Sequence, residues 1–512
     1  MDRNPTKRLA WVKRFIEGGQ TYAASVSAIG DTSYFLGLFN GETTLSDETF
    51  DAPAQLILTE NSSVGEIINA WSLIQYPGRR EQLVISDLQA IDVDRVRRFY
   101  SIVGFSGDIS IFSNQRVNSI GTGNELFLVT DRRPRIIFYH HLSGTQSNSQ
   151  LISDKNGNSY VIGSFNRVLL LDGKEILTST LKSDSFILKF DPMGRIVWYI
   201  KGGGTEQTTG RDIAIIQSGG NSLTSMNIGG KDLSDETGGE SPDLLVAVGT
   251  FMDTITLGNT VLKNNSAWFT SWVGILTSEG NWVKAFSIKA NPESSIDHSQ
   301  PEYLTMERVT TDDLGNIYTI GESSGTFMFG KKMILSLKPI GIFVAKWSPT
   351  GNLIWLRNVL TKIPPNNGIF PRLVTDKLGN SFVSGYSWNG LKLESEKQSI
   401  DVDGSGSIDF FLAQLSPDGN WLWSFIFPGI IDSPSNLTAV GNPSAVSGIN
   451  YVSRNVPNST ESGINSEKNT EIITHELNQT TLFAAGINLV NSTQRDAFIS
   501  RLFTDSSTED LI

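Results

Sequence analysis

A pattern of about 60 residues occurs three times in this chain, and it constrains the fold more than any other feature. The clear copies cover 148–201, 307–358 and 371–427. Each copy opens near D-x-x-G-N, continues with an apolar run that holds a glycine, and ends with P-x-G and an apolar run that holds a tryptophan. A pattern repeated at a regular period marks a repeat architecture. The chain is therefore expected to be an array of similar units.

Each copy predicts four short β-strands separated by turns. In the first clear copy, strands are expected at 150–153, 160–165, 186–190 and 196–201, with a tight turn at 154–158. The turn holds Asp, which caps backbone amides, and Gly, which accepts a positive φ angle. The second and third strands are apolar at almost every position, as in strands buried on both faces. Each unit is thus predicted to pack between two neighbours.

A glycine in the second strand allows the units to be counted, because weaker copies surround the clear ones. The seven glycines are Gly37, Gly104, Gly163, Gly249, Gly321, Gly385 and Gly486. We therefore predict an all-β fold, a single seven-bladed β-propeller of four-stranded antiparallel blades, which we call units one to seven in chain order. The expected blades are 20–76, 82–143, 147–204, 209–288, 303–361, 369–427 and 434–503 plus 9–19, with a tail at 504–512.

The two ends of the chain are predicted to form one sheet. Unit seven supplies a third strand at 496–503 but no fourth strand before the sequence ends. The segment 9–19 (LAWVKRFIEGG) resembles a fourth strand without the three that precede it. Pairing of these segments would close the ring and remove two exposed sheet edges. We therefore expect the N-terminal strand to complete the last blade.

Long connections are expected on one face of the disc. Insertions at 217–243 and 442–475, with a smaller one at 88–98, are placed between the first and second strands of their units. Loops of this length are either functional or surface elaborations. Short hairpins at 169–177 and 255–262, with another at 327–335, join second and third strands and are expected on the opposite face, where their polar tips could bind a ligand.

Composition excludes several classes of function. The net charge is −12, and no long basic cluster exists that would bind a phosphate backbone, so nucleic acid is not an expected partner. The absence of cysteine excludes disulfides and thiolate chemistry. No apolar run approaches the length of a membrane span, and the first residues lack the apolar stretch of a signal peptide. A cytoplasmic or virion-associated protein is expected.

At this point the motif resembles a known family. The sequence D-x-x-G-N-x-(Y/F)-x-x-G, followed by D-x-F-(I/L)-x-(K/R)-(F/L) and P-x-G-x-x-x-W, is similar to the SBBP-type β-propeller repeat. Clear matches cover units three, five and six, about a third of the chain. The family occurs in bacteria and archaea, with similar proteins in large DNA viruses. The resemblance implies a propeller with binding or structural roles, and it implies no catalytic residue.

One segment has the spacing of a calcium loop. Asp401, Asp403, Ser405 and Asp409 occupy positions one, three, five and nine of D-V-D-G-S-G-S-I-D. The acidic ligand expected at position twelve is replaced by Leu412, inside a predicted strand. The segment is therefore a weak calcium candidate, and no other metal site and no cofactor is predicted.

The remaining chemistry-bearing residues have structural interpretations. The repeated aspartates Asp154, Asp312 and Asp376 are expected to cap turns. The repeated tryptophans are expected to pack between blades rather than to stack on sugars. These tryptophans are Trp11, Trp198, Trp355 and Trp423. The pair His140–His141 lies in a strand, where alternate side chains point to opposite faces, and the other histidines are His298 and His475.

Two functions remain open from sequence. The first is a non-enzymatic scaffold or protein–protein interaction module, for example a structural component of a virus particle, with partners bound through the face of the insertions. The alternative is a carbohydrate-binding or carbohydrate-active propeller with acids near the inner strands. The candidates for that alternative are Asp87, Glu307 and Arg372, which are too scattered across units to predict one site.

Overall fold

The structure is a computed structural model in which the described residues form antiparallel β-sheets, with no helix among them. The described residues are 8–15, 20–29, 32–51, 54–76, 88–94, 96–112, 115–146, 149–216, 227–228, 231–232, 243–265, 268–290, 302–329, 332–335, 340–361, 371–388, 390–395, 398–404, 408–428, 437–440, 479–491 and 494–505. None of them belongs to a helix that could cross a membrane. The prediction of an all-β fold is confirmed.

Unit three has the four strands that its sequence predicts. They are β14 (Gln150–Ser153), β15 (Ser159–Leu171), β16 (Lys174–Phe190) and β17 (Ile196–Gly202), paired in that order. The second and third strands run beyond the prediction, because the hairpin that joins them continues the same two strands. The turn at 154–158 is closed by the Gly157 amide, which donates to the Asp154 carbonyl at 3.0 Å.

The other units repeat this order from a first to a fourth strand. The four strands of units one and two are β2 (Gln20–Ile29), β3 (Thr32–Asn40), β6 (Ala54–Asn61) and β7 (Ile67–Tyr76), then β8 (Leu88–Val93), β9 (Phe99–Phe105), β12 (Asn124–Thr130) and β13 (Ile136–Thr145). Those of units four and five are β18 (Thr208–Ile216), β21 (Leu244–Phe251), β24 (Thr270–Thr277) and β25 (Trp282–Ser287), then β27 (Tyr303–Thr311), β28 (Ile317–Ser324), β31 (Gly341–Trp347) and β32 (Leu353–Thr361). Those of unit six are β33 (Arg372–Thr375), β34 (Ser381–Trp388), β37 (Ile408–Leu415) and β38 (Trp421–Pro428), and those of unit seven are β39 (Leu437–Val440), β40 (Gln479–Asn491), β41 (Gln494–Asp505) and β1 (Arg8–Phe15).

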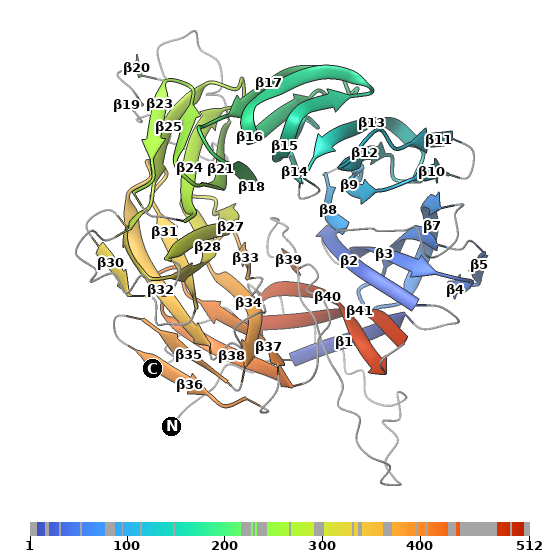
Figure 1. The fold of residues 1–512 in the computed structure, drawn as a ribbon. Coiled ribbons are helices and arrows are strands. Elements are labelled where there is room, and N and C mark those ends of the chain that lie inside the picture. Colours follow the sequence, from blue (N-terminus) through green and yellow to red (C-terminus); the bar gives the residue numbers. More distant parts are fainter. Residues whose placement is uncertain are drawn as a thin grey trace.

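The sheets follow one another along a curved path, and the first strand of each unit lies toward the centre of that curve (Figure 1). First strands of consecutive units are neighbours: β18 lies beside β14 and β27, and β39 lies beside β33 and β2. Five of the six apolar clusters formed by the described residues span two consecutive units, and the sixth lies within unit one. For example, Leu56 and Leu58 of unit one share a cluster with Val103 and Leu126 of unit two. Burial of apolar side chains between sheets therefore joins each unit to the next.

The N-terminal strand pairs with the last strand of the chain, as predicted. β1 runs antiparallel to β41, with Arg8 opposite Phe503 and Phe15 opposite Ala497. β41 pairs in turn with β40, and β40 with β39. Strands from the two ends of the chain thus occupy one four-stranded sheet. The side chain of Trp11 lies outside the described residues.

The hairpins between second and third strands have a role that the sequence did not reveal. The hairpin of β10 (Asp108–Ile111) and β11 (Gln115–Asn118) pairs with β7 of the preceding unit. The hairpin of β35 (Leu391–Glu394) and β36 (Ser399–Val402) pairs in the same way with β32, and the extended β15 pairs with β13. The prediction of hairpins is confirmed, but these examples are edge strands that extend the neighbouring unit's sheet. Three further pairs occupy the same place in their units: β4 (Thr43–Leu45) with β5 (Glu48–Phe50), β22 (Thr254–Leu257) with β23 (Thr260–Lys263), and β29 (Thr326–Phe329) with β30 (Lys332–Leu335). Of the last pair, β29 also pairs with β26 (Lys289–Ala290).

The insertions are only partly described. The connection at 217–243 contains two short paired strands, β19 (Asn227–Ile228) and β20 (Lys231–Asp232), and the rest, apart from Asp243, lies outside the described residues. The insertion at 442–475 lies entirely outside them. The predicted insertion at 88–98 is wrong, because Leu88–Val93 is the first strand of unit two. The strand is hard to recognise in the sequence, because its apolar pattern is short and is interrupted by the polar residues Gln89 and Asp92.

A recurring tryptophan contact holds the fourth strands of units three and five to the next unit. The Trp355 Nε1–H donates to the Pro417 carbonyl at 2.9 Å, and the indole covers Gly419, which has a φ angle of +77°. Trp198 makes the equivalent contact with Ser278 at 3.0 Å. A side chain at Gly419 would lie 2.8 Å from the indole, so the glycine leaves room for the tryptophan. Packing between units is thereby confirmed for these two tryptophans.

Candidate functional site: a charged cluster on the inner strands

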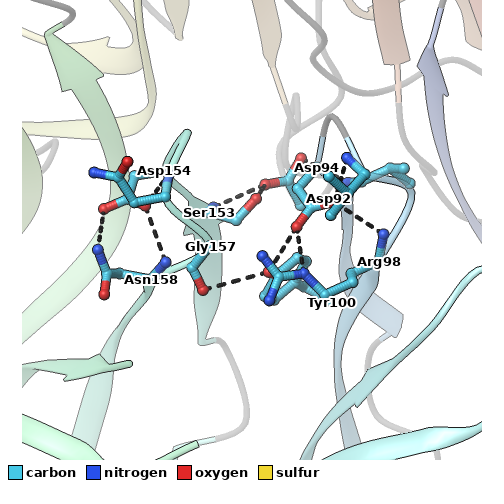
Figure 2. A network of polar contacts seen from close by, with 11 residues as sticks. Asp92, Asp94, Arg98, Tyr100, Ser153, Asp154, Gly157 and Asn158 are labelled. Atoms are coloured by element: carbon cyan, nitrogen blue, oxygen red, sulfur yellow. Dashed lines mark hydrogen bonds and ion pairs between the residues drawn. The ribbon is translucent and has the colours of Figure 1, made fainter. Parts of the chain in front are cut away.

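The repeated aspartates cap turns rather than form a ring of free carboxylates. Asp154 Oδ1 accepts the backbone amides of Asn156 and Asn158, each at 2.9 Å (Figure 2). Its Oδ2 accepts the Tyr160 hydroxyl at 3.2 Å. Asp312 and Asp376 accept the amides two and four residues further on in the same way. These carboxylates are occupied by the turns that they stabilise.

Figure 2 also shows how two such turns meet between units two and three. Asp94 is the capping residue of unit two and receives the Tyr100 hydroxyl at 3.0 Å. The neighbouring Asp92 reaches across to unit three, where its Oδ2 accepts the amide and the hydroxyl of Ser153 at 2.8 and 2.6 Å. Burial raises the pKa of Asp92, and the Ser153 bonds oppose that rise. This polar network joins units two and three.

The two adjacent histidines point to different partners, as predicted. The His140 ring contacts Asp172 Oδ2 and the Gly194 carbonyl, each at 2.7 Å. The His141 ring contacts Asn124 Oδ1 at 2.8 Å. Among the residues that the structure describes, no group of three or more His, Asp or Glu side chains could hold a metal ion. His298 and His475 lie outside the described residues.

The calcium candidate is only partly described. Asp401 and Asp403 are exposed at the end of the β36 strand, whereas Asp409 is fully buried in β37 opposite Ser387. Ser405 lies outside the described residues. The calcium loop therefore stays a prediction.

Charged side chains of units four, five and six come together on the first strands. Arg211 and Asp212 belong to β18, Glu307 and Arg308 to β27, and Arg372 to β33. Asp212, Arg308 and Arg372 occupy the same register, since each is paired with the residue before the second-strand glycine. Because β27 lies beside both β18 and β33, this register brings the three side chains to one place.

Two β-bulges add the remaining members of the cluster. The pairing of β18 with β21 shifts between Gly210 and Asp212, so Arg211 is an extra residue. The pairing of β27 with β28 shifts between Met306 and Arg308, so Glu307 is the equivalent extra residue. Bulges re-aim side chains and are frequent beside functional sites. Here they place Arg211 Nη1 3.6 Å from Glu307 Oε2.

The carboxylates of the cluster have partners, but the guanidinium groups are poorly matched. Asp212 Oδ2 accepts the Val309 amide at 2.9 Å. Arg372 Nη1 donates to the carbonyl of its own neighbour Pro371 at 3.3 Å, and its buried Nε has no hydrogen-bond partner. The buried Nε of Arg211 also lacks a partner. A buried guanidinium nitrogen without an acceptor is costly, so these groups favour an incoming acceptor.

The pKa values in the cluster reflect burial and an excess of positive charge. Burial and the neighbouring Arg308 together lower the pKa of Arg372 to about 9. Burial raises the pKa of Asp212 to about 6, although Arg308 opposes the rise. Burial alone would raise the pKa of Glu307, but Arg211 and Arg308 outweigh it and hold the pKa below its usual value. The positive charges of the cluster thus keep Glu307 ionised, and the charges of Arg308 and Arg372 repel each other.

Sequence reasoning named two members of this cluster but did not join them. The expectation that Glu307 and Arg372 are too scattered to share a site is wrong, because β27 and β33, which carry them, lie side by side. Asp87 lies outside the described residues. An alignment of the repeats by strand pairing would have revealed the cluster. In that alignment Asp212, Arg308 and Arg372 are equivalent, because each pairs with the residue that precedes the second-strand glycine.

Comparisons with known proteins give no family. No protein-family model and no curated protein matches the chain. Among solved structures, the chain is similar to the crystal structure of a protein of unknown function from Bacteroides caccae, with 9% identity over 79% of this chain and 94% of that chain. The TM-score is 0.26, and a similarity at this level carries no argument. The resemblance to the SBBP-type repeat stays a prediction.

Proposed function

We propose that the chain is a closed seven-bladed β-propeller of the SBBP type that acts as a non-enzymatic scaffold and binds protein partners through one face. Closure is supported by the pairing of β1 with β41 and by the position of β39 beside β2 and β33. Rigidity is supported by the hairpins and tryptophans that join consecutive units. A structural component of a large assembly, such as a virus particle, is one concrete version.

The observation that carries the proposal is a set of exposed apolar side chains at one repeated turn position. In antiparallel units, the turns after the first and third strands lie at the same edge. The third residue of five such turns is apolar and between 51% and 70% exposed. These residues are Val64, Val96, Met193, Leu314 and Leu378. Repetition on one edge distinguishes them from the single exposed apolar residues of any protein surface.

The turn geometry explains why these side chains point to solvent. The amide of Leu314 donates to Asp312 Oδ1 at 3.0 Å, and Gly315 follows with a φ angle of +76°. The Leu378 amide donates to Asp376 Oδ1 in the same way at 3.0 Å. The backbone of the apolar residue is thus fixed by the turn, while its side chain has no role in the turn.

The same edge is suited to a mixed interface. Other turns carry polar residues at the third position, among them Asn156, Glu279 and Thr350. The first strands β18 and β39, which precede the sequence insertions 217–243 and 442–475, also end at this edge. Apolar anchors among polar groups are typical of protein–protein interfaces. The proposed partner is therefore a protein that covers this edge.

The test replaces the five apolar turn residues by serine in the full chain. Wild type and variant are cross-linked in the native source and purified by affinity, and recovered proteins are quantified by mass spectrometry. We expect the variant to lose its partner by about tenfold or more, because apolar anchors dominate such interfaces. A control variant replaces Val261 and Ile120, exposed residues of the opposite edge, and should retain the partner. A wild-type chain recovered only as a free monomer, or a variant that keeps the partner, would contradict the proposal.

A further inference from the structure

We propose that Arg211, Arg308 and Arg372 bind a small-molecule oxyanion, a carboxylate or phosphate group, on the inner strands. This site is separate from the proposed docking edge, because Arg308 and Arg372 lie four residues before Asp312 and Asp376, the capping aspartates of the turns at that edge. It goes beyond the scaffold function, which does not require a small ligand.

The geometry of the three strands supports a built site. Two equivalent bulges and one shared register gather five charged residues from three units. Packing of seven units does not require this, since unit three carries the uncharged Gln150 in the same register. The side chains of Arg211 and Glu307 are 31% and 19% exposed, so solvent reaches the cluster.

Charge identifies the class of ligand. Three guanidinium groups face two carboxylates, which leaves the cluster positive within a chain of net charge −12. One carboxylate, Asp212, is also engaged with the backbone of β27. Guanidinium groups bind carboxylate and phosphate oxygens through paired N–H donors, with geometric specificity that lysine does not offer. Burial, followed by Arg308, lowers the pKa of Arg372, and the negative charges of Glu307 and Asp212 offset this only in part.

Asp212 and Arg372 have opposite expected effects on binding. Asp212→Asn removes a negative charge beside the anion but keeps an acceptor for the Val309 amide. Arg372→Gln removes a positive charge and its N–H donors. A merely structural role would not give opposite changes in anion affinity, so the pair of variants separates ligand binding from packing.

The experiment is calorimetric titration of the full chain with citrate and with inorganic phosphate at pH 7.5 and constant ionic strength. Wild type is expected to bind at least one probe, and the tighter probe assigns the carboxylate or phosphate class. We expect Arg372→Gln to weaken binding about tenfold or more and Asp212→Asn to strengthen it severalfold. Arg195→Gln is the matched control, because that arginine is 81% exposed in the turn before β17 and its replacement should leave affinity unchanged.

Three results would overturn the proposal. The first is that wild type binds neither probe at concentrations up to about 10 mM, which corresponds to very weak affinity. Alternatively, Arg372→Gln would bind as tightly as wild type, or Asp212→Asn would bind more weakly. The first of these results needs no variant, so the proposal can fail even if Arg372→Gln does not fold.

Discussion

The junction between units two and three and the junction between units five and six use the same positions with different side chains. At the later junction Trp355 covers Gly419, and at the earlier one Phe138 covers Gly194. Both aromatic residues occupy the same register on the fourth strand, each after a bulge. Only the indole has an N–H, and it donates to the Pro417 carbonyl. The aromatic contact is thus general, whereas its hydrogen bond is particular to tryptophan.

The residue two positions further on differs more in its chemistry. Arg357 donates through Nε to the Gly419 carbonyl, and its guanidinium lies 5.4 Å from the centre of the Trp355 ring. His140 takes the equivalent position and contacts the Gly194 carbonyl and Asp172. Both imidazole nitrogens face acceptors, and only the protonated ring can donate from both. One architecture therefore supports a junction that is insensitive to pH and another that responds to it.

The largest effect is expected from Trp355→Ala. The side chain is buried, and its removal leaves a cavity over Gly419 and takes away one of two donors to the Pro417 carbonyl, the other being Lys346 Nζ. We expect the free energy of unfolding to fall by about 3–5 kcal/mol in urea denaturation. Phe138→Ala should cost less, because Phe138 is only partly buried. An equal or larger loss for Phe138→Ala would break the comparison.

Arg357→Gln should be the next most damaging change, independently of pH. The side chain is buried and donates to carbonyl groups of the turn in unit six. Loss of charged hydrogen bonds is expected to cost about 2–3 kcal/mol. The guanidinium stays charged throughout the accessible range, so the loss should be equal at about pH 5.5 and pH 8.5. A loss that varies between these two pH values would contradict the account.

His140→Gln should destabilise the protein mainly at low pH. Burial alone would lower the pKa of His140, but the bonds to Asp172 and Gly194 outweigh it and raise the pKa above 6.5. A base with a raised folded-state pKa contributes stability that is complete below 6.5 and is lost as pH rises through the folded value. We expect a loss of about 1–2 kcal/mol at pH 5.5 and a smaller one at pH 8.5. His140→Arg is the control that should remove the pH dependence.

The smallest effect is expected from the tyrosines that donate to the turn aspartates. Tyr318→Phe removes one bond, of 2.9 Å, to Asp312 and should cost about 1 kcal/mol. Tyr100→Phe at the earlier junction should cost at least as much, because that hydroxyl also lies 3.4 Å from the Gly157 carbonyl. Unit six carries Phe382 at this position, so the bond is dispensable for the turn. Thermal unfolding of both variants would show whether their order is as expected.

The sequence predicted the features that depend on neighbours along the chain. The turn at 154–158 and the four strands of unit three follow from Asp, Gly and apolar runs, which act locally. Pairing of the two ends followed from a missing strand at one end and an unpaired strand at the other. Each of these inferences needed only the pattern of one unit.

Features that depend on two units were harder to predict. Nothing in the sequence of 391–402 states that its hairpin pairs with β32, because edge pairing depends on where the preceding sheet ends. The charged cluster needed three units in correct register and two bulges, each of which shifts the pairing by one residue. The environment of His140 was likewise hard to predict, because Asp172 and Gly194, which its ring contacts, belong to the next unit.

The proposed ring is tested most directly by a cross-link between its two ends. The chain has no cysteine, so a variant with Val12→Cys and Ser500→Cys carries only the two introduced thiols. Val12 and Ser500 are opposite each other in the pairing of β1 with β41, within reach of a disulfide. We predict that mild oxidation gives an intramolecular bond in the folded monomer, found by mass spectrometry of the digested protein, and that each single-cysteine variant gives none. Recovery of unlinked thiols, or of dimers alone, would contradict closure of the ring.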